Sequence, residues 1–156
     1  MEARQEKTED RETARKRVVD LLARADIHDL SRCWDALAPQ PEVAMLRGPE
    51  IGLVMVRGRI GGGGAPFNLG EATVSRAAVR LGNGLVGHGH VLGAHLKRAR
   101  LAAIFDALWQ DDDHRDRIEA ELLRPLEARM TEDERKKSEE VAATRVDFFT
   151  MIRGED

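Results

Sequence analysis

Residues 51–91 read IGLVMVRGRIGGGGAPFNLGEATVSRAAVRLGNGLVGHGHV, and this stretch decides the fold. In its first ten residues, Leu53, Met55, Arg57 and Arg59 alternate with small or β-branched residues. Alternation of this kind, with β-branched residues, is typical of a strand. Four consecutive glycines followed by Ala-Pro then predict a flexible turn into a second extended segment.

The second extended segment, residues 72–81, admits two interpretations. Its residues alternate as they would in a long strand, yet SRAAVRL also contains good helix formers. We predict a strand, because Gly-Asn-Gly at 82–84 makes a tight hairpin turn and residues 85–91 look extended. Residues 43–47 read as a further short strand before a Gly-Pro turn at 48–49. The middle of the chain is therefore predicted to be an antiparallel meander of three to four strands.

Helical periodicity flanks the meander on both sides. Val18, Leu21, Leu22 and Ala25 recur at the three- and four-residue spacing of one helical face, after a charged start at 1–11 that we expect to be frayed. Helical segments are expected at 18–25, 28–38, 95–109 and 115–123, with a long charged segment at 125–144. The order of helices, meander and helices predicts an α+β fold, and the length predicts a single domain spanning residues 1–156.

Composition narrows the class of protein. The chain has 156 residues, 42% hydrophobic and 34% charged, as expected of one globular domain. The net charge is only −3, but residues 47–100 hold eight Lys or Arg against two Glu. A basic middle suits an anionic ligand or an acidic partner surface. The alternative is that the basic middle and the acidic C-terminal third neutralise each other within the fold.

Cysteine content and the N-terminus indicate the compartment. Cys33 is the single cysteine, so no intrachain disulfide can form. The charged N-terminus lacks the apolar stretch of a signal peptide, and the apolar runs are too short to span a membrane. We expect a soluble cytoplasmic protein without a membrane partner. The basic strands carry almost no aromatic residues, which argues against nucleic-acid binding.

The four-glycine run is the first candidate for a binding site. Consecutive backbone N–H groups can approach a phosphate, and Arg57 and Arg59 flank the run. The run lacks the spacing of a P-loop, so we favour a pliable hairpin turn. Arg57, Arg59, Arg76 and Arg80 remain the candidate contacts to an anion or a partner. Glu71 could act as a general base but is expected to pair with an arginine such as Arg76 or Arg80.

Three histidines form the second candidate. His88 and His90 would share one face of a strand, and His95 follows shortly. Three imidazoles could ligate a metal ion with one position left open. No carboxylate or cysteine lies close by in sequence to complete the set. We therefore predict polar histidines on a strand face and no metal site.

The C-terminal segment RVDFFTMIRG, residues 145–154, is unusually apolar for a chain end. Phe148, Phe149 and Met151 would either cover the domain's own core or dock on a partner protein. Both interpretations stay open.

Several motifs taken together resemble one protein family. They are GLVMVRGRIGGGGAPFNLGEATVSRAAVRL at 52–81, GNGLVGHGHVLG at 82–93, ARLAAIFDAL at 99–108 and TRVDFFTMIRG at 144–154. The chain resembles the PhnG family of phosphonate metabolism, the G subunit of the bacterial carbon–phosphorus lyase core complex. The similarity covers nearly the whole chain from about residue 15 onward.

The resemblance implies a role within an assembly. In the family, the G subunit joins the H, I and J subunits, with the L and K proteins associated. With H, I and L it supports displacement of adenine from the C1′ of ATP by methylphosphonate, which gives α-D-ribose 1-methylphosphonate 5-triphosphate. The I subunit is thought to carry this chemistry, and the resemblance provides no catalytic residue for the G subunit. The expectation is a non-catalytic subunit without a cofactor of its own, for which ATP is a substrate of the complex.

Two other functions remain to be distinguished. The chain could contribute to an active site, with the four arginines binding anionic oxygens and Glu71 or His88 moving protons. It could also be a freestanding module that binds a small ligand, which would raise its melting temperature.

Overall fold

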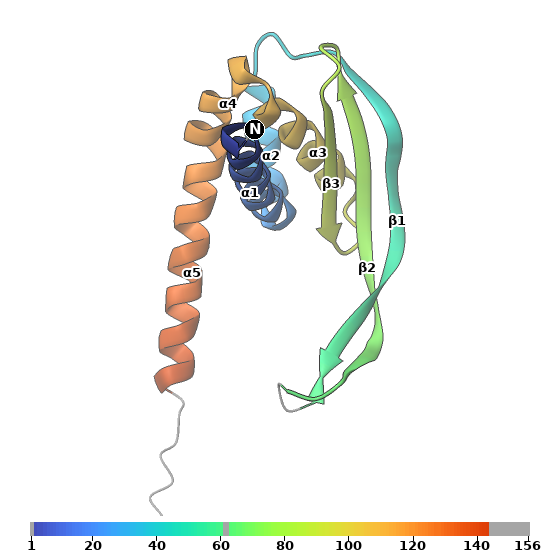
Figure 1. The fold of residues 1–156 in the computed structure, drawn as a ribbon, viewed down its shortest axis with the longest axis vertical. Helices are drawn as coiled ribbons and strands as arrows, with labels where there is room; N and C mark the ends of the chain where they lie inside the picture. Colours follow the sequence, from blue (N-terminus) through green and yellow to red (C-terminus); the bar gives the residue numbers. More distant parts are fainter. Residues whose placement is uncertain (1, 61–62, 144–156) are drawn as a thin grey trace, which may run out of the picture.

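The computed structural model describes residues 2–60 and 63–143 and has the expected α+β architecture. Three antiparallel strands form one sheet in the order β1-β2-β3, with helices before and after it in the chain (Figure 1). The elements are α1 (Glu2–Arg24), α2 (Ile27–Asp35), β1 (Val43–Arg59), β2 (Pro66–Leu81), β3 (Val86–Leu92), α3 (Leu96–Gln110), α4 (Asp112–Ile118), the π-helical turn η2 (Glu119–Leu123) and α5 (Arg124–Ala143).

The disputed segment at 72–81 is a strand, as predicted. Ser75, Ala77, Val79 and Leu81 alternate along β2 and are all buried against the helices. The predicted hairpin turn follows, in which the backbone N–H of Gly84 donates to the carbonyl of Leu81 at 2.8 Å. Burial of every second side chain on one face outweighs the helix propensity of SRAAVRL.

One expectation about local structure was wrong in detail. No turn interrupts the chain at Gly48 and Pro49, since β1 runs through both and pairs with β2 on either side of them. A proline is tolerated there because β1 is an edge strand, and register irregularities absorb the extra residues. The helix α1 begins at Glu2 and so includes residues 2–11, whose fraying stays a prediction. Their Glu, Arg, Lys and Ala content favours a helix even without an apolar face.

The core is built around α3. This helix packs against β2 and β3 on one side and contacts α1, α2 and α4 on others (Figure 1). Its residues from Leu101 to Trp109 are all buried, as expected of a helix that is covered all round. The core therefore lies between the sheet and the other helices, and the face of the sheet turned away from α3 stays open.

Ser75 ties the connection between β3 and α3 to the sheet. Its fully buried Oγ donates to the carbonyl of Gly93 at 2.8 Å and accepts from the backbone N–H of His95 at 2.7 Å. A single hydroxyl thus satisfies two backbone groups of a turn that has no regular structure of its own.

We expect Ser75→Ala to lower the free energy of unfolding by about 1–3 kcal/mol, because both backbone groups lose their partner in a water-poor position. Urea denaturation measures the loss. Ser138→Ala is the control, since Ser138 is exposed on α5 and its change should stay within about 0.5 kcal/mol. Equal stabilities of the two variants would contradict the role given to the Ser75 hydroxyl.

Candidate interaction surfaces

The hairpin formed by β1 and β2 extends well beyond the third strand. β3 pairs with β2 only over Val74–Arg80, whereas β1 pairs with β2 as far as Arg59 and Pro66. Residues 53–60 and 63–73 therefore form a two-stranded segment that projects past β3 and α3 and is called the arm (Figure 1).

Most of the exposed large apolar side chains of the described residues lie on the arm. Leu53 is 63% exposed, Leu69 is 62% exposed and Ile60 is 75% exposed. The others on the arm are Val54, Met55, Val56 and Phe67. A contiguous exposed apolar surface of this kind is more often a site of protein–protein or ligand contact than a result of chance.

Both faces of the arm are apolar. Leu53 lies opposite Thr73 in the ladder, on the side that continues the buried face of β2. Val54 lies opposite Ala72 and faces the other way. Neither face is covered by any other described part of the chain.

Arg57 and Arg59 lie toward the tip of the arm, as the sequence placed them beside the glycine run. Arg57 pairs with Asn68 in the ladder and Arg59 with Pro66, and both side chains are exposed. Arg59 Nη1 donates to the carbonyl of Gly64 at 3.3 Å. Among the described residues, neither arginine forms a salt bridge.

Arg76 and Arg80 belong to a different surface, the face of the sheet turned away from α3. Arg76 lies opposite His90, and His88 lies opposite Ala78 between Arg76 and Arg80. The four candidate arginines are therefore not one site: two lie on the arm and two on this outer sheet face.

Glu71 was expected to pair with an arginine such as Arg76 or Arg80, and this expectation was wrong. Arg76 Nε donates to Glu50 Oε1 at 2.5 Å, and Arg47 Nη2 lies 2.6 Å from the same oxygen. Glu71 lies opposite Met55 in the arm instead. Glu50 is the partner of Arg76 because it lies directly opposite Arg76 on β1. The side chains of such a cross-strand pair lie close together on the same face of the sheet. A strand register would have identified Glu50, but the irregularities around residues 47–50 hide that register from the sequence.

The pKa of Glu50 is lowered from its ordinary value, with the hydrogen bond from Arg76 as the largest cause and the charge of Arg47 adding to it. A lowered pKa favours the folded state above the ordinary pKa, and this contribution is lost as the pH falls through the folded value. We expect Arg76→Ala to raise the Glu50 titration midpoint, measured by NMR of its side-chain carboxyl carbon. Arg80→Ala is the control, and an equal rise there would mean that general positive charge, not the bond, sets this pKa.

His88 and His90 are exposed on the outer sheet face, as polar strand-face histidines should be. His95 is not on the strand but precedes α3 as its N-cap residue. Over the part of the chain that the structure describes, no group of three or more His, Cys, Asp or Glu is placed to hold a metal ion.

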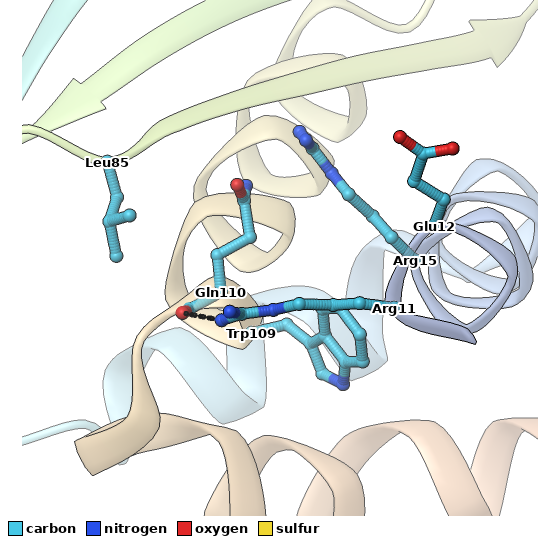
Figure 2. Close-up of a pocket in the computed structure, with 6 residues that line it drawn as sticks. All are labelled: Arg11, Glu12, Arg15, Leu85, Trp109 and Gln110. Carbon is cyan, nitrogen blue, oxygen red and sulfur yellow. Dashed lines mark hydrogen bonds between the residues drawn. The ribbon is translucent and has the colours of Figure 1, made fainter. Parts of the chain in front are cut away.

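A hollow of about 300 Å³ lies between α1 and the end of α3, lined by Arg11, Glu12, Arg15, Leu85, Trp109 and Gln110 (Figure 2). Arg11 Nη2 donates to the carbonyl of Gln110 at 3.4 Å, the bond dashed in Figure 2. Arg15 is paired with Asp106 at 2.8 Å. Both guanidinium groups hold α1 against α3. We therefore interpret this hollow as part of the packing between these two helices.

Two further expectations remain, one about the C-terminal segment and one about membrane-spanning helices. Phe148, Phe149 and Met151, predicted to dock on a partner or to cover the core, lie outside them. Within them, no helix combines the length and the apolar character needed to cross a bilayer.

Comparison with known proteins agrees with the resemblance noted in the sequence. A family model described as phosphonate metabolism protein PhnG matches residues 13–154. The chain is 63% identical over 142 residues to the alpha-D-ribose 1-methylphosphonate 5-triphosphate synthase subunit PhnG of Rhizobium meliloti (strain 1021). That alignment covers 91% of this chain and 90% of the relative. With a match of this extent to both, the chain belongs to the PhnG family of phosphonate metabolism proteins.

Proposed function

We propose that this chain is an accessory subunit of α-D-ribose 1-methylphosphonate 5-triphosphate synthase and acts in phosphonate catabolism. The support is its 63% identity to a relative that carries this name, over nine-tenths of the chain. The complex that it joins would transfer the ribosyl group of ATP to methylphosphonate and release adenine.

The proposed partners are the H, I and J subunits of the carbon–phosphorus lyase core complex, with L and K associated, in the cytoplasm. The structural observation that carries a role in assembly is the arm, whose two apolar faces are left uncovered by the other residues that the structure describes. A subunit that completes its own fold does not need such a surface, whereas a subunit that fits against neighbours does.

We further propose that this subunit carries no catalytic group and no cofactor. The two residues considered for proton transfer support this view by their positions. Glu71 lies in the arm opposite Met55, and His88 lies on the outer sheet face opposite Ala78. They project from different parts of the sheet, so they do not form an acid–base pair.

Omission and restoration test the proposal. The synthase subunits are co-expressed with and without this chain, and adenine release from ATP is measured in the presence of methylphosphonate. We expect the complete assembly to be active, the assembly without this chain to be inactive, and added purified chain to restore activity. Turnover by this chain alone, or full activity without it, would overturn the proposal.

The rival role as a contributor to the active site is tested in the same assay. On the outer sheet face, Arg80, His88 and His90 are all exposed. These three side chains are therefore the candidates for a contribution to the active site. We expect Arg80→Ala, His88→Ala and His90→Ala to leave kcat within about twofold in the assembled complex, since an exposed structural side chain makes no contact specific to the transition state. A loss of kcat with intact assembly would favour the rival.

A further inference from the structure

We propose that the arm docks into an apolar cleft with an acidic rim on another subunit of the synthase, so that the partner covers both faces of the arm. This inference rests on the proposed function, because it takes the occupant to be a member of the same assembly. It adds which segment makes the contact and what chemistry receives it.

The arm lacks the support that the rest of the sheet has. Over residues 74–80, β2 is flanked by β1 and β3 and covered by α3. Beyond Val74 the sheet is reduced to two strands, and two-stranded hairpins alone are at best marginally stable in water. Both strands of the arm also present an edge of unpaired backbone groups, which proteins normally cover or protect. Docking would supply the missing cover.

The shape of the receiving surface follows from the two faces. Leu53 and Met55 point to one side of the arm, and Val54 and Val56 point to the other. A flat partner surface would cover one set and leave the second in water. A cleft covers both sets at once, and its walls would have to be apolar for the burial to be favourable.

The charge of the rim follows from the residues near the tip. The arm carries Arg57 and Arg59 against a single acid, Glu71, so its net charge is positive. Both arginines are exposed, and neither has an ion pair in the described part of the chain. Carboxylates at the mouth of the cleft would pair with them, orient the arm and speed its association.

A second copy of this chain is a poorer occupant. The hollows described on this chain each contain acidic and basic side chains in their lining, among them Arg11, Arg17, Asp29 and Glu134. None of these four hollows has walls free of charged groups, which burial of the arm's apolar faces would require. Two arms could meet edge to edge, but this arrangement would leave the faces of both uncovered.

The test uses two double variants, one for each face. Leu53→Ser with Met55→Ser removes apolar surface from one side, and Val54→Ser with Val56→Ser from the other. Affinity for the complex of the remaining synthase subunits is measured by biolayer interferometry. We expect each double variant to bind at least about 30-fold more weakly than the wild type, as for central residues of an interface. Leu46→Ser is the matched control, because Leu46 is 46% exposed on the same strand outside the arm.

Each outcome has a defined meaning. If only one face matters, the enclosing cleft is wrong; if neither matters while the wild type binds, the arm is not the contact, although the proposed function stands. If the wild type does not bind the other subunits at all, the proposed function fails first. Unchanged melting temperatures of the variants will show that a loss of binding is not a loss of folding. An arm-dependent dimer of the purified chain in sedimentation analysis, with no effect on binding to the partner subunits, would assign the arm to a second copy and overturn the inference.

The acidic rim has its own test. Arg57→Glu with Arg59→Glu should weaken binding at least about tenfold at low salt and remove most of its salt dependence, since the tip would then repel the rim. Arg80→Glu is the control, as an exposed arginine of β2 outside the arm. Undiminished binding by the double charge reversal would overturn the acidic rim.

Discussion

Gly89→Ala is expected to lower the free energy of unfolding by about 3 kcal/mol or more, in the upper range for overpacked cores. A Cβ at Gly89 would lie 2.0 Å from the carbonyl oxygen of Ala99 and 2.7 Å from the nitrogen of Ala103. Both atoms belong to the backbone of α3, so no side chain can rotate away to make room. The helix and the strand would have to separate, and the core around α3 would lose its packing.

The same close contact recurs two residues earlier on β3, at Gly87. A Cβ at Gly87 would lie 2.0 Å from the carbonyl oxygen of Ala103 and 2.6 Å from the nitrogen of Ala107. Alanines at 99, 103 and 107 are four residues apart and so lie on one face of α3. Glycines on β3 thus oppose alanines on α3, and this seam brings the two backbones close together. Gly87→Ala should therefore be as harmful as Gly89→Ala.

Gly48→Ala is the matched control for both variants. A Cβ at Gly48 would have no atom within 4 Å, so this change should be neutral or stabilising by up to about 1 kcal/mol. Urea denaturation followed by circular dichroism measures all three. If Gly89→Ala were as stable as Gly48→Ala, the close approach of β3 to α3 would be wrong.

The strands were within reach of sequence analysis because each has a buried face. Every second residue of β2 from Ser75 to Leu81 is buried, so the period of two was visible despite the helix formers in SRAAVRL. The glycines at 87 and 89 looked only like extended chain, although they mark the seam with α3. A glycine gives no signal in a hydrophobicity pattern. The reason for glycine at these two positions is the close contact with α3, a helix that follows later in the chain.

The arm could have been foreseen in part. β3 has 7 residues and β2 has 16, so the third strand is too short to support the whole hairpin. The sequence shows this difference in length, but the apolar residues of the arm were taken as evidence of a strand and not of an exposed surface. A continuous apolar run cannot separate a strand that is buried on both faces from one that is apolar on both faces and uncovered, because burial is decided by the rest of the fold.

The salt bridges could not be foreseen, because they join distant segments. Asp106 lies at the beginning of the acidic C-terminal third of the sequence, yet it is fully buried and bound to Arg15, 91 residues earlier. An aspartate within an apolar helix carries no local sign of its partner. The partner is set by how α1 crosses α3, which depends on packing of the whole core.

Asp106→Ala is expected to lower the free energy of unfolding by about 3 kcal/mol, the lower end of the range for a broken buried ion pair. Arg15 Nε donates to Asp106 Oδ1 at 3.0 Å, and Arg15 Nη2 donates to Oδ2 at 2.8 Å. The backbone N–H of His88 donates to Oδ2 at 2.8 Å. One carboxylate on α3 therefore holds both α1 and β3, and its removal leaves a guanidinium and a backbone donor without their acceptor.

The lower end of the range applies because the Arg15 side chain is partly open to water and can be solvated when its partner is lost. The pKa of Arg15 is raised from its ordinary value, with the hydrogen bond to Asp106 as the largest cause. A raised pKa means that the stabilisation is present below the ordinary arginine value, so it operates throughout the neutral range. The expected loss should thus be nearly constant between pH 6 and 8, a range that lies far below the raised pKa of Arg15.

A double-mutant cycle separates the ion pair from the bond to β3. Arg15→Ala alone should cost at least as much as Asp106→Ala, because it leaves the fully buried Asp106 carboxylate without its counter-charge, although the bond from His88 stays in place. The double variant should cost less than the sum of the two, with a coupling of about 1–3 kcal/mol for groups in direct contact. Asp112→Asn is the control, since Asp112 is 83% exposed and its loss should stay within about 0.5 kcal/mol. Additive single effects would mean that Asp106 stabilises the protein through β3 alone, and that α1 is held on α3 by its apolar contacts.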